Sequence, residues 1–338
     1  MLRLFLATAV VVQHFSHFHL GHWAVCVFFI LSGYWISVMY RKKYRLTKTP
    51  VLTFWCSRYL RLAPVYLACT GLALVIIRLT SRHWFDFAML HDPAWVLRTL
   101  AIVSSSSQHW VVIVPAWSLD VEMQFYLLAP LLLLALARAR IFASVLIIIG
   151  LAITGLFVGT TVGLPSNLVF FLSGAVIDRS HWRPGRGIAL ASLAAFAGIV
   201  CAVLLTPAWQ PLLIFASVPM SEPSYRLTLI LAFVCLPMVA YTLEQPSDAL
   251  DKHAGDLAYS VYLFHPCVYL VANYLAGFPS PTRVFLSHWA WLLVAPGSLA
   301  VYLLVDRPAE VLRKRFVASR LRKGVVARQY PIAEPVGT

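Results

Sequence analysis

Long uncharged apolar stretches dominate this sequence and limit what it can fold into. Runs of roughly 18 or more residues recur along the chain, and each is long enough to cross a ~30 Å hydrocarbon layer as a helix. Of its 338 residues, 60% are hydrophobic and only 12% are charged, and the mean hydropathy is +0.79. Soluble domains are about half apolar and about a quarter charged. The chain is therefore predicted to be an all-α, polytopic integral membrane protein.

About ten transmembrane helices are expected, because one apolar run follows another along nearly the whole chain. The expected spans are residues 2–20, 23–40, 62–79, 118–137, 141–159, 163–179, 187–206, 224–243, 256–277 and 284–305. A weaker apolar segment, 94–106, is expected to be re-entrant or interfacial. We found no internal repeat or second domain. The membrane domain is thus expected to occupy 1–306, followed by a poorly ordered basic tail at 307–338.

The net charge of +14 is explained by where the basic residues lie. Seven Lys/Arg fall in 41–61, two in 138–140, three in 178–186 and eight in the tail from Arg307, whereas the intervening loops hold few. By the positive-inside rule both termini are predicted to be cytoplasmic, and the basic loops would contact anionic membrane lipids. No nucleic-acid partner is expected.

Neither the cysteines nor the N-terminal segment argues against a polytopic membrane protein. The six cysteines are scattered singly without a CxxC spacing, so neither a disulfide framework nor a zinc site is indicated. A cleaved signal peptide is also not expected. No small-residue cleavage site follows the first apolar run, and a second run begins almost at once.

Four histidines occur in QHFSHFHLGH, at the outer end of the first predicted span: His14, His17, His19 and His22. A metal site is one interpretation, but no acidic or cysteine partner lies beside them, so no metal is expected. His14 follows Arg3 by eleven residues, about 16 Å and three turns of helix, so the two share one face. His17 also lies near that face. The alternative is a topology-setting arginine and a core histidine.

Two further segments place polar groups at the membrane. In FWCSRYLRLAPVYL, Arg58 and Arg61 lie on one helical face and suit a phosphate, although such a pair taken alone is more often a cytoplasmic anchor. In PAWSLDVEMQFYLLAP, an N-cap at Ser118 accounts for Asp120 through the helix dipole. It does not account for Glu122.

The remaining candidates are polar residues within two predicted spans. Tyr126 lies on the face of Ser118 and Glu122, and Glu122 is predicted at the depth of His14, near the outer surface. In DLAYSVYLFHPCVYL, Tyr259 and His265 lie in one span, where a packed aromatic helix with a satisfied histidine is the alternative. Ionisable groups at such depths are costly and are functional-site hypotheses by default.

Taken together, these stretches resemble acyltransferase family 3, the integral membrane enzymes that O-acylate bacterial surface polysaccharides. The matching stretches are the Arg3–His14 spacing, VCVFFILSGYWIS, FWCSRYLRLAPVY, WSLDVEMQFYLLAPLLL and LAYSVYLFHP, in the family's order from Arg3 to Pro308. The family commonly ends its last span with Glu before Pro, whereas this chain has Asp306-Arg307-Pro308. The sequence shows no counterpart of the hydrolase-like domain fused to some members, so a stand-alone form is expected.

The resemblance implies a multi-pass enzyme of the bacterial inner membrane that uses acyl-CoA, with acetyl-CoA expected, and no bound cofactor. Arg3, Arg58 and Arg61 would then bind the anionic donor. His14 would act as general base on a hydroxyl of a glycan or lipid-linked sugar, oriented by Glu122 or, less favourably, Asp120. The supporting candidates are His17, Ser118, Asp120, Tyr126, Tyr259 and His265. Direct transfer and an acyl-histidine intermediate both remain open, as does a homo-oligomer.

A different class of protein also fits some of these residues. A proton-coupled transporter or flippase for a lipid-linked sugar would use Arg3, Glu122 and His14 as an ion path. The sequence shows no inverted repeat or paired broken helices of the kind common in secondary transporters.

Overall fold

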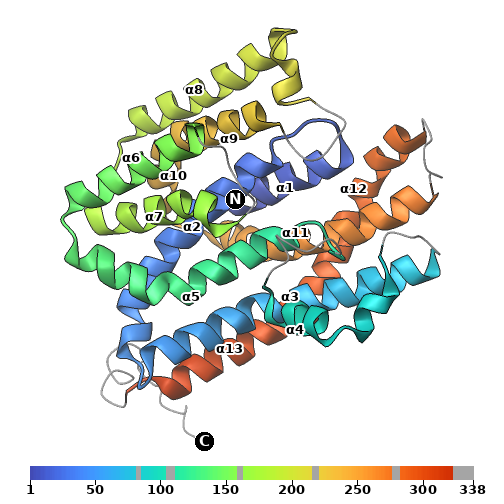
Figure 1. The fold of residues 1–338 in the computed structure, drawn as a ribbon, viewed down its shortest axis with the longest axis horizontal. Helices are drawn as coiled ribbons and strands as arrows, with labels where there is room; N and C mark the ends of the chain where they lie inside the picture. Colours follow the sequence, from blue (N-terminus) through green and yellow to red (C-terminus); the bar gives the residue numbers. More distant parts are fainter. Residues whose placement is uncertain (81–84, 104–110, 158–162, 215–220, 276–281, 323–338) are drawn as a thin grey trace, which may run out of the picture.

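The computed structural model shows a bundle of α-helices (Figure 1). It describes the chain except residues 81–84, 104–110, 158–162, 215–220, 276–281 and 323–338, with backbone alone at 282–291. In these described ranges the only β pairing consists of two isolated bridges. The predicted all-α fold is therefore confirmed.

Thirteen α-helices follow one another along the described chain. They are α1 (Leu2–Phe15), α2 (Gly21–Lys42), α3 (Pro50–Leu79), α4 (Pro93–Ala101), α5 (Ala116–Arg138), α6 (Ile141–Phe157), α7 (Leu164–Ser180), α8 (Arg186–Leu205), α9 (Glu222–Val234), α10 (Leu236–Leu243), α11 (Ala249–Leu275), α12 (Thr282–Val301) and α13 (Arg307–Arg320). Short 3-10 turns lie at η1 (Tyr44–Leu46), η2 (Phe87–His91) and η3 (Gln210–Leu212), and the π-helix η4 (Tyr302–Asp306) joins α12 to α13.

The described helices include five that are long and apolar enough to cross a membrane, or six when α9 and α10 count as one span bent by 43°. α1 and α6 are apolar but shorter. The chain is thus a membrane protein by its helices, while the count of ten spans and the position of the termini stay predictions. The ends of the expected spans at 158–159 and 276–277 lie outside the described residues.

The helix α3 begins twelve residues before the expected span at 62–79. Pro50 occupies its first turn, where the missing N–H costs no hydrogen bond. Arg58 and Arg61 therefore lie inside a continuous 30-residue helix rather than in a loop before it. This extension brings both guanidinium groups into the bundle.

Close packing of α2 against α7 forms the centre of the core. A Cβ added at Gly33 would collide with the Phe171 carbonyl oxygen, and one at Gly174 would collide with the Ile30 carbonyl oxygen. Only glycine permits the two backbones to approach this closely. Phe171 is itself stacked between Phe29 and Phe125, which ties α5 to this pair of helices.

The expectation of a poorly ordered tail from 307 is wrong for its first half. Residues Arg307–Arg320 form α13, which lies along α3 (Figure 1). The Arg313 guanidinium donates to Ser57 Oγ on α3 at 3.1 Å, and Val317 is buried. Packing against α3 stabilises a segment that its charge alone would leave exposed. The rest of the tail, 323–338, lies outside the described residues.

Candidate active site

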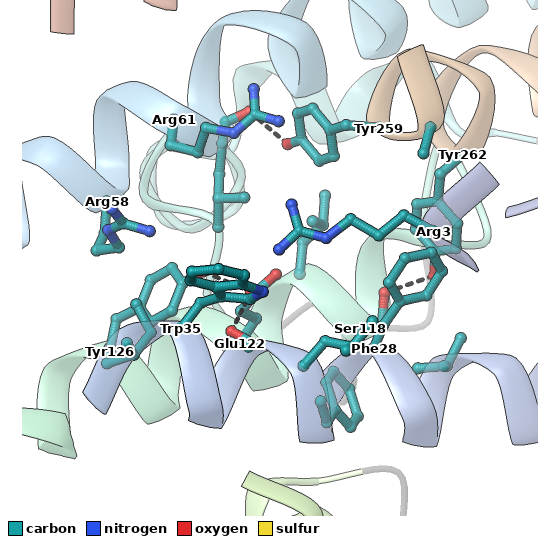
Figure 2. Close-up of a pocket in the computed structure, with 18 of the residues that line it drawn as sticks. Arg3, Phe28, Trp35, Arg58, Arg61, Ser118, Glu122, Tyr126, Tyr259 and Tyr262 are labelled. Atoms are coloured by element: carbon teal, nitrogen blue, oxygen red, sulfur yellow. Dashed lines mark hydrogen bonds between the residues drawn. The ribbon is translucent and has the colours of Figure 1, made fainter. Parts of the chain in front are cut away.

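A cavity of about 160 Å³ opens between α1, α2, α3, α5 and α11 (Figure 2). Three arginines, Arg3, Arg58 and Arg61, line it together with a single carboxylate, that of Glu122. Figure 2 shows the Arg3 side chain extending from α1 into the space between the other two arginines and Glu122. The cavity therefore gathers more positive than negative charge, in a part of the bundle that is otherwise apolar.

Arg61 has its own counter-ion. Its Nη1 donates to Asp306 Oδ1 at 2.6 Å, and its guanidinium lies 4.9 Å from the centre of the Tyr259 ring. Asp306 is the last residue of the π-helix η4, a wider turn that accommodates the ring of Pro308, which cannot donate a helical hydrogen bond. This ion pair gives Asp306 a structural role that the sequence left open.

Arg58 is held by aromatic groups instead. Its Nη2 donates to the Tyr44 hydroxyl at 2.6 Å, and its guanidinium carbon lies 5.6 to 5.9 Å from the ring centres of Tyr44, Phe54 and Tyr126. Within the described residues, no carboxylate lies within ion-pair distance of Arg58 or Arg3. Ring faces attract a cation without neutralising it. Arg3 and Arg58 thus keep their full charge for a ligand in the cavity.

Glu122 is positioned by two hydroxyl groups. Ser32 donates to its Oε1 at 2.7 Å, and Tyr126, one turn further along α5, donates to the same oxygen. No described donor bonds to Oε2. The carboxylate also interacts electrostatically with Arg3. Glu122 is therefore part of the arginine cavity.

The expected contact between Glu122 and His14 is absent from the described hydrogen bonds. His14 lies about 16 Å along α1 from Arg3, and its ring contacts His265, with ring centroids 5.1 Å apart. Glu122 instead interacts electrostatically with Arg3, near the opposite end of α1. The neighbour of His14 is another imidazole.

Ser118 and two tyrosines of α11, Tyr259 and Tyr262, line another side of the cavity. The Tyr262 and Ser118 hydroxyl groups are 2.6 Å apart, and both residues line the cavity. Ser118 was expected as the N-cap of its helix, but α5 begins at Ala116, and Ser118 donates to the Pro115 carbonyl at 2.9 Å from within the first turn. Tyr259 donates to the Leu62 carbonyl at 2.8 Å beside Arg61.

The other candidates lie away from the cavity. Asp120 is fully buried and accepts a hydrogen bond from Gln124 Nε2 at 2.9 Å. His17 is exposed, whereas His19 is buried. His22 stacks on Trp117 at 5.3 Å and meets the Tyr225 ring edge-on. The four histidines of the opening segment therefore enter different surroundings.

Sequence reasoning missed three groups that complete the cavity. Ser32 and Trp35 line it from α2, and Tyr44 binds Arg58 from the turn after that helix. Phe28, Ser32 and Trp35 are spaced four and three residues apart, which places them on one helical face. That spacing was the available signal, because a serine and two aromatic residues on one face form a partly polar stripe in an apolar helix.

Comparison with known proteins agrees with this arrangement. The family model described as "Acyltransferase domain" matches residues 1–307. The exopolysaccharide production protein ExoZ of Rhizobium meliloti (strain 1021) is 26% identical over 325 residues, which cover 92% of this chain and 96% of ExoZ. Nodulation protein 10 of Rhizobium leguminosarum bv. viciae is 27% identical, with 95% of each chain covered.

A third relative is similar over a shorter region. O-acetyltransferase OatA of Staphylococcus aureus (strain NCTC 8325 / PS 47) is 29% identical over 181 residues, 46% of this chain and 28% of OatA. No solved structure is significantly similar to the chain. The family match covers all five motifs and the whole cavity, so the chain belongs to the acyltransferase 3 family.

Proposed function

We propose that this protein transfers an acyl group, acetyl in the first instance, from cytoplasmic acyl-CoA to a hydroxyl of an extracytoplasmic glycan or lipid-linked sugar. The observation that carries the proposal is the surplus of positive charge in the cavity, where Arg3 and Arg58 form no ion pair with any described carboxylate. A buried cation without a counter-ion is costly unless a ligand supplies the negative charge.

The charge pattern matches a donor that carries phosphate groups. Arginine binds phosphate oxygens in a bidentate manner and stays charged in an apolar site. Arg58 and Arg3 are the proposed phosphate contacts, whereas Arg61, neutralised by Asp306, is proposed to shape the cavity wall. Trp35, which lines the cavity at 39% exposure, offers a ring face to the donor.

His14 is the proposed general base. A sugar hydroxyl attacks the thioester carbon as His14 takes its proton, the C–O bond forms, and the C–S bond breaks. The proton then passes to the CoA thiolate, so the products are an ester and CoA thiol. An imidazole, with an ordinary pKa near 6.5, works as a base at neutral pH. Glu122 is proposed to act on the donor side, through Arg3.

The names of two relatives support the proposed reaction and acceptor. One is named for exopolysaccharide production and another for O-acetyl transfer. We propose a multi-pass protein of the bacterial inner membrane with both termini in the cytoplasm, so that the basic residues of 41–61 face the donor.

Mass spectrometry of surface glycans tests this function. A strain that lacks the protein is complemented with the wild type or with His14→Ala, and insertion of both is checked by immunoblot of washed membranes. The wild type is expected to restore an acyl mass that is missing from the deletion strain, and His14→Ala is expected not to. If deletion changes the amount of exported glycan but not its acylation, the protein is a transporter or flippase and the proposed acyl transfer is wrong.

A further inference from the structure

We propose that His265 is the positioning residue of His14, and that its unprotonated Nε2 fixes the ring orientation and tautomer of that base. The inference rests on the proposed function for its catalytic meaning. The contact itself is a feature of the described structure, with ring centroids 5.1 Å apart and ring planes inclined by 37°.

The hydrogen bond of His265 determines where its proton lies. Its Nδ1 is 3.2 Å from the Val261 carbonyl oxygen in the preceding turn of α11. A carbonyl oxygen only accepts, so Nδ1 carries the hydrogen and Nε2 of the neutral ring carries a lone pair. Pro266, directly after His265, has no N–H for the Tyr262 carbonyl, which loosens the helix where the ring folds back.

The lone pair on Nε2 has no hydrogen-bond donor. His265 is fully buried, and its Nε2 is one of the buried polar atoms without a partner in the described structure. An unpaired buried polar atom is unfavourable, so a hydrogen bond donated to it would stabilise the site. Among the described residues, the titratable side chains whose rings contact the His265 ring are His14 and Tyr262.

Tyr262 is not available as that donor. Ser118 gives its only hydroxyl hydrogen to the Pro115 carbonyl, so the Tyr262 hydroxyl must donate to Ser118 in their 2.6 Å hydrogen bond. Of the rings that contact His265 in the described residues, His14 is then the one that can donate a hydrogen bond. One N–H of His14 directed to His265 Nε2 leaves the other nitrogen as the lone pair that accepts the hydroxyl proton.

This arrangement replaces the carboxylate expected from the sequence. In hydrolase triads a carboxylate orients the base and selects its tautomer, but here Glu122 lies in the arginine cavity with Ser32 and Tyr126. A neutral imidazole orients His14 without adding a negative charge at this depth. The His265 ring contacts both His14 and Tyr262, and Tyr262 lines the cavity.

Two substitutions separate positioning from packing. His265→Asn keeps a donor near the Nδ1 position and removes the acceptor at Nε2, whereas His265→Gln places an amide oxygen near Nε2. We expect His265→Asn to lower kcat at least tenfold with KM for acetyl-CoA changed less than twofold, and His265→Gln to recover most of kcat. Equal kcat in the two variants, or a loss confined to KM, would overturn the proposal.

A measurement without catalysis keeps the proposal testable if either variant misfolds or the wild type shows no transfer. Nitrogen NMR of ¹⁵N-histidine-labelled wild-type protein reports the tautomer of each ring, with the His265 signals assigned from their loss in His265→Gln or His265→Phe. We expect a neutral His265 protonated on Nδ1. Protonation on Nε2 would refute the inference, whereas absent transfer with the expected tautomer would count against the proposed function alone.

Discussion

At the scale of single residues, the three arginines of the cavity differ in what neutralises them. Arg61 is paired with Asp306, Arg58 lies among ring faces and a phenol, and Arg3 extends into the open space. Sequence spacing predicted that Arg58 and Arg61 share a helical face. It could not predict which of them is paired, because Asp306 is 245 residues away along the chain.

The Arg58 charge is expected to govern donor binding. Arg58→Gln should raise KM for acetyl-CoA at least tenfold with kcat changed less than threefold, since a charge-assisted hydrogen bond contributes about 1.5–3 kcal/mol. Steady-state kinetics with purified protein measures both constants. Arg78→Gln is the matched control, because Arg78 lies on the same helix against Phe87, outside the cavity.

Unchanged KM in Arg58→Gln would exclude Arg58 as a phosphate contact. An equal rise in the Arg78→Gln control would show that the effect reflects the charge of the whole α3 surface.

At the scale of helices, the sequence predicted which segments are helical better than it predicted where each helix begins and ends. Hydrophobic runs located the helices because apolar side chains must face lipid or core. They missed that α3 starts at Pro50, since the basic residues of 41–61 read as a loop. They also missed α13, because a basic segment is helical here only through α3, with Arg313 against Ser57.

The ion pair between Arg61 and Asp306 should stabilise the junction of η4 and α13. Asp306 is 5% exposed and Arg61 24%, so Asp306→Asn leaves a largely buried cation unpaired and should cost about 3 kcal/mol of unfolding free energy. Denaturation in detergent measures the loss. Glu222→Gln, which removes an exposed pair with Arg226, should cost less than about 1 kcal/mol. Equal losses in the two variants would contradict the structural role of Asp306.

The glycine contacts of α2 and α7 give a second test at this scale. Gly33→Ala should lower the midpoint of thermal unfolding, because overpacking costs about 1–3 kcal/mol and the new methyl meets the Phe171 carbonyl. Gly198→Ala on α8 meets open space and should be neutral or slightly stabilising. A destabilised Gly198→Ala beside an unchanged Gly33→Ala would show that the two helices do not pack this closely.

At the scale of the whole molecule, the cavity is made by three successive helices, α1 to α3, together with α5 and the distant α11. Arg3, Arg58, Glu122 and Tyr259 were each predicted as candidates, and the fold brings them to one cavity. His14 was predicted beside Glu122 and instead meets His265. Helix periodicity fixes which residues share a face, but not which helix covers that face. The sequence therefore predicted most of the individual site residues, but it could not predict which of them contact one another.

The proposed topology is testable with reporter fusions. Alkaline phosphatase fused after Thr338 should be inactive, because the positive-inside rule places the C-terminus in the cytoplasm. The same reporter fused after Trp209, between α8 and η3, should be active. The reverse pattern would place the arginine cavity away from the cytoplasmic donor.

The most direct test of the central claim is transfer of label from radioactive acetyl-CoA to membrane glycan by the purified protein in proteoliposomes. The wild type should incorporate label. His14→Ala should incorporate at least a hundredfold less, because removal of a general base costs about 10²- to 10⁴-fold, while it binds acetyl-CoA with unchanged affinity. Incorporation by His14→Ala at the wild-type rate, in correctly inserted protein, would contradict the assignment of His14 as the base. No incorporation by the wild type, with the acceptor glycan present, would contradict the proposed transfer itself.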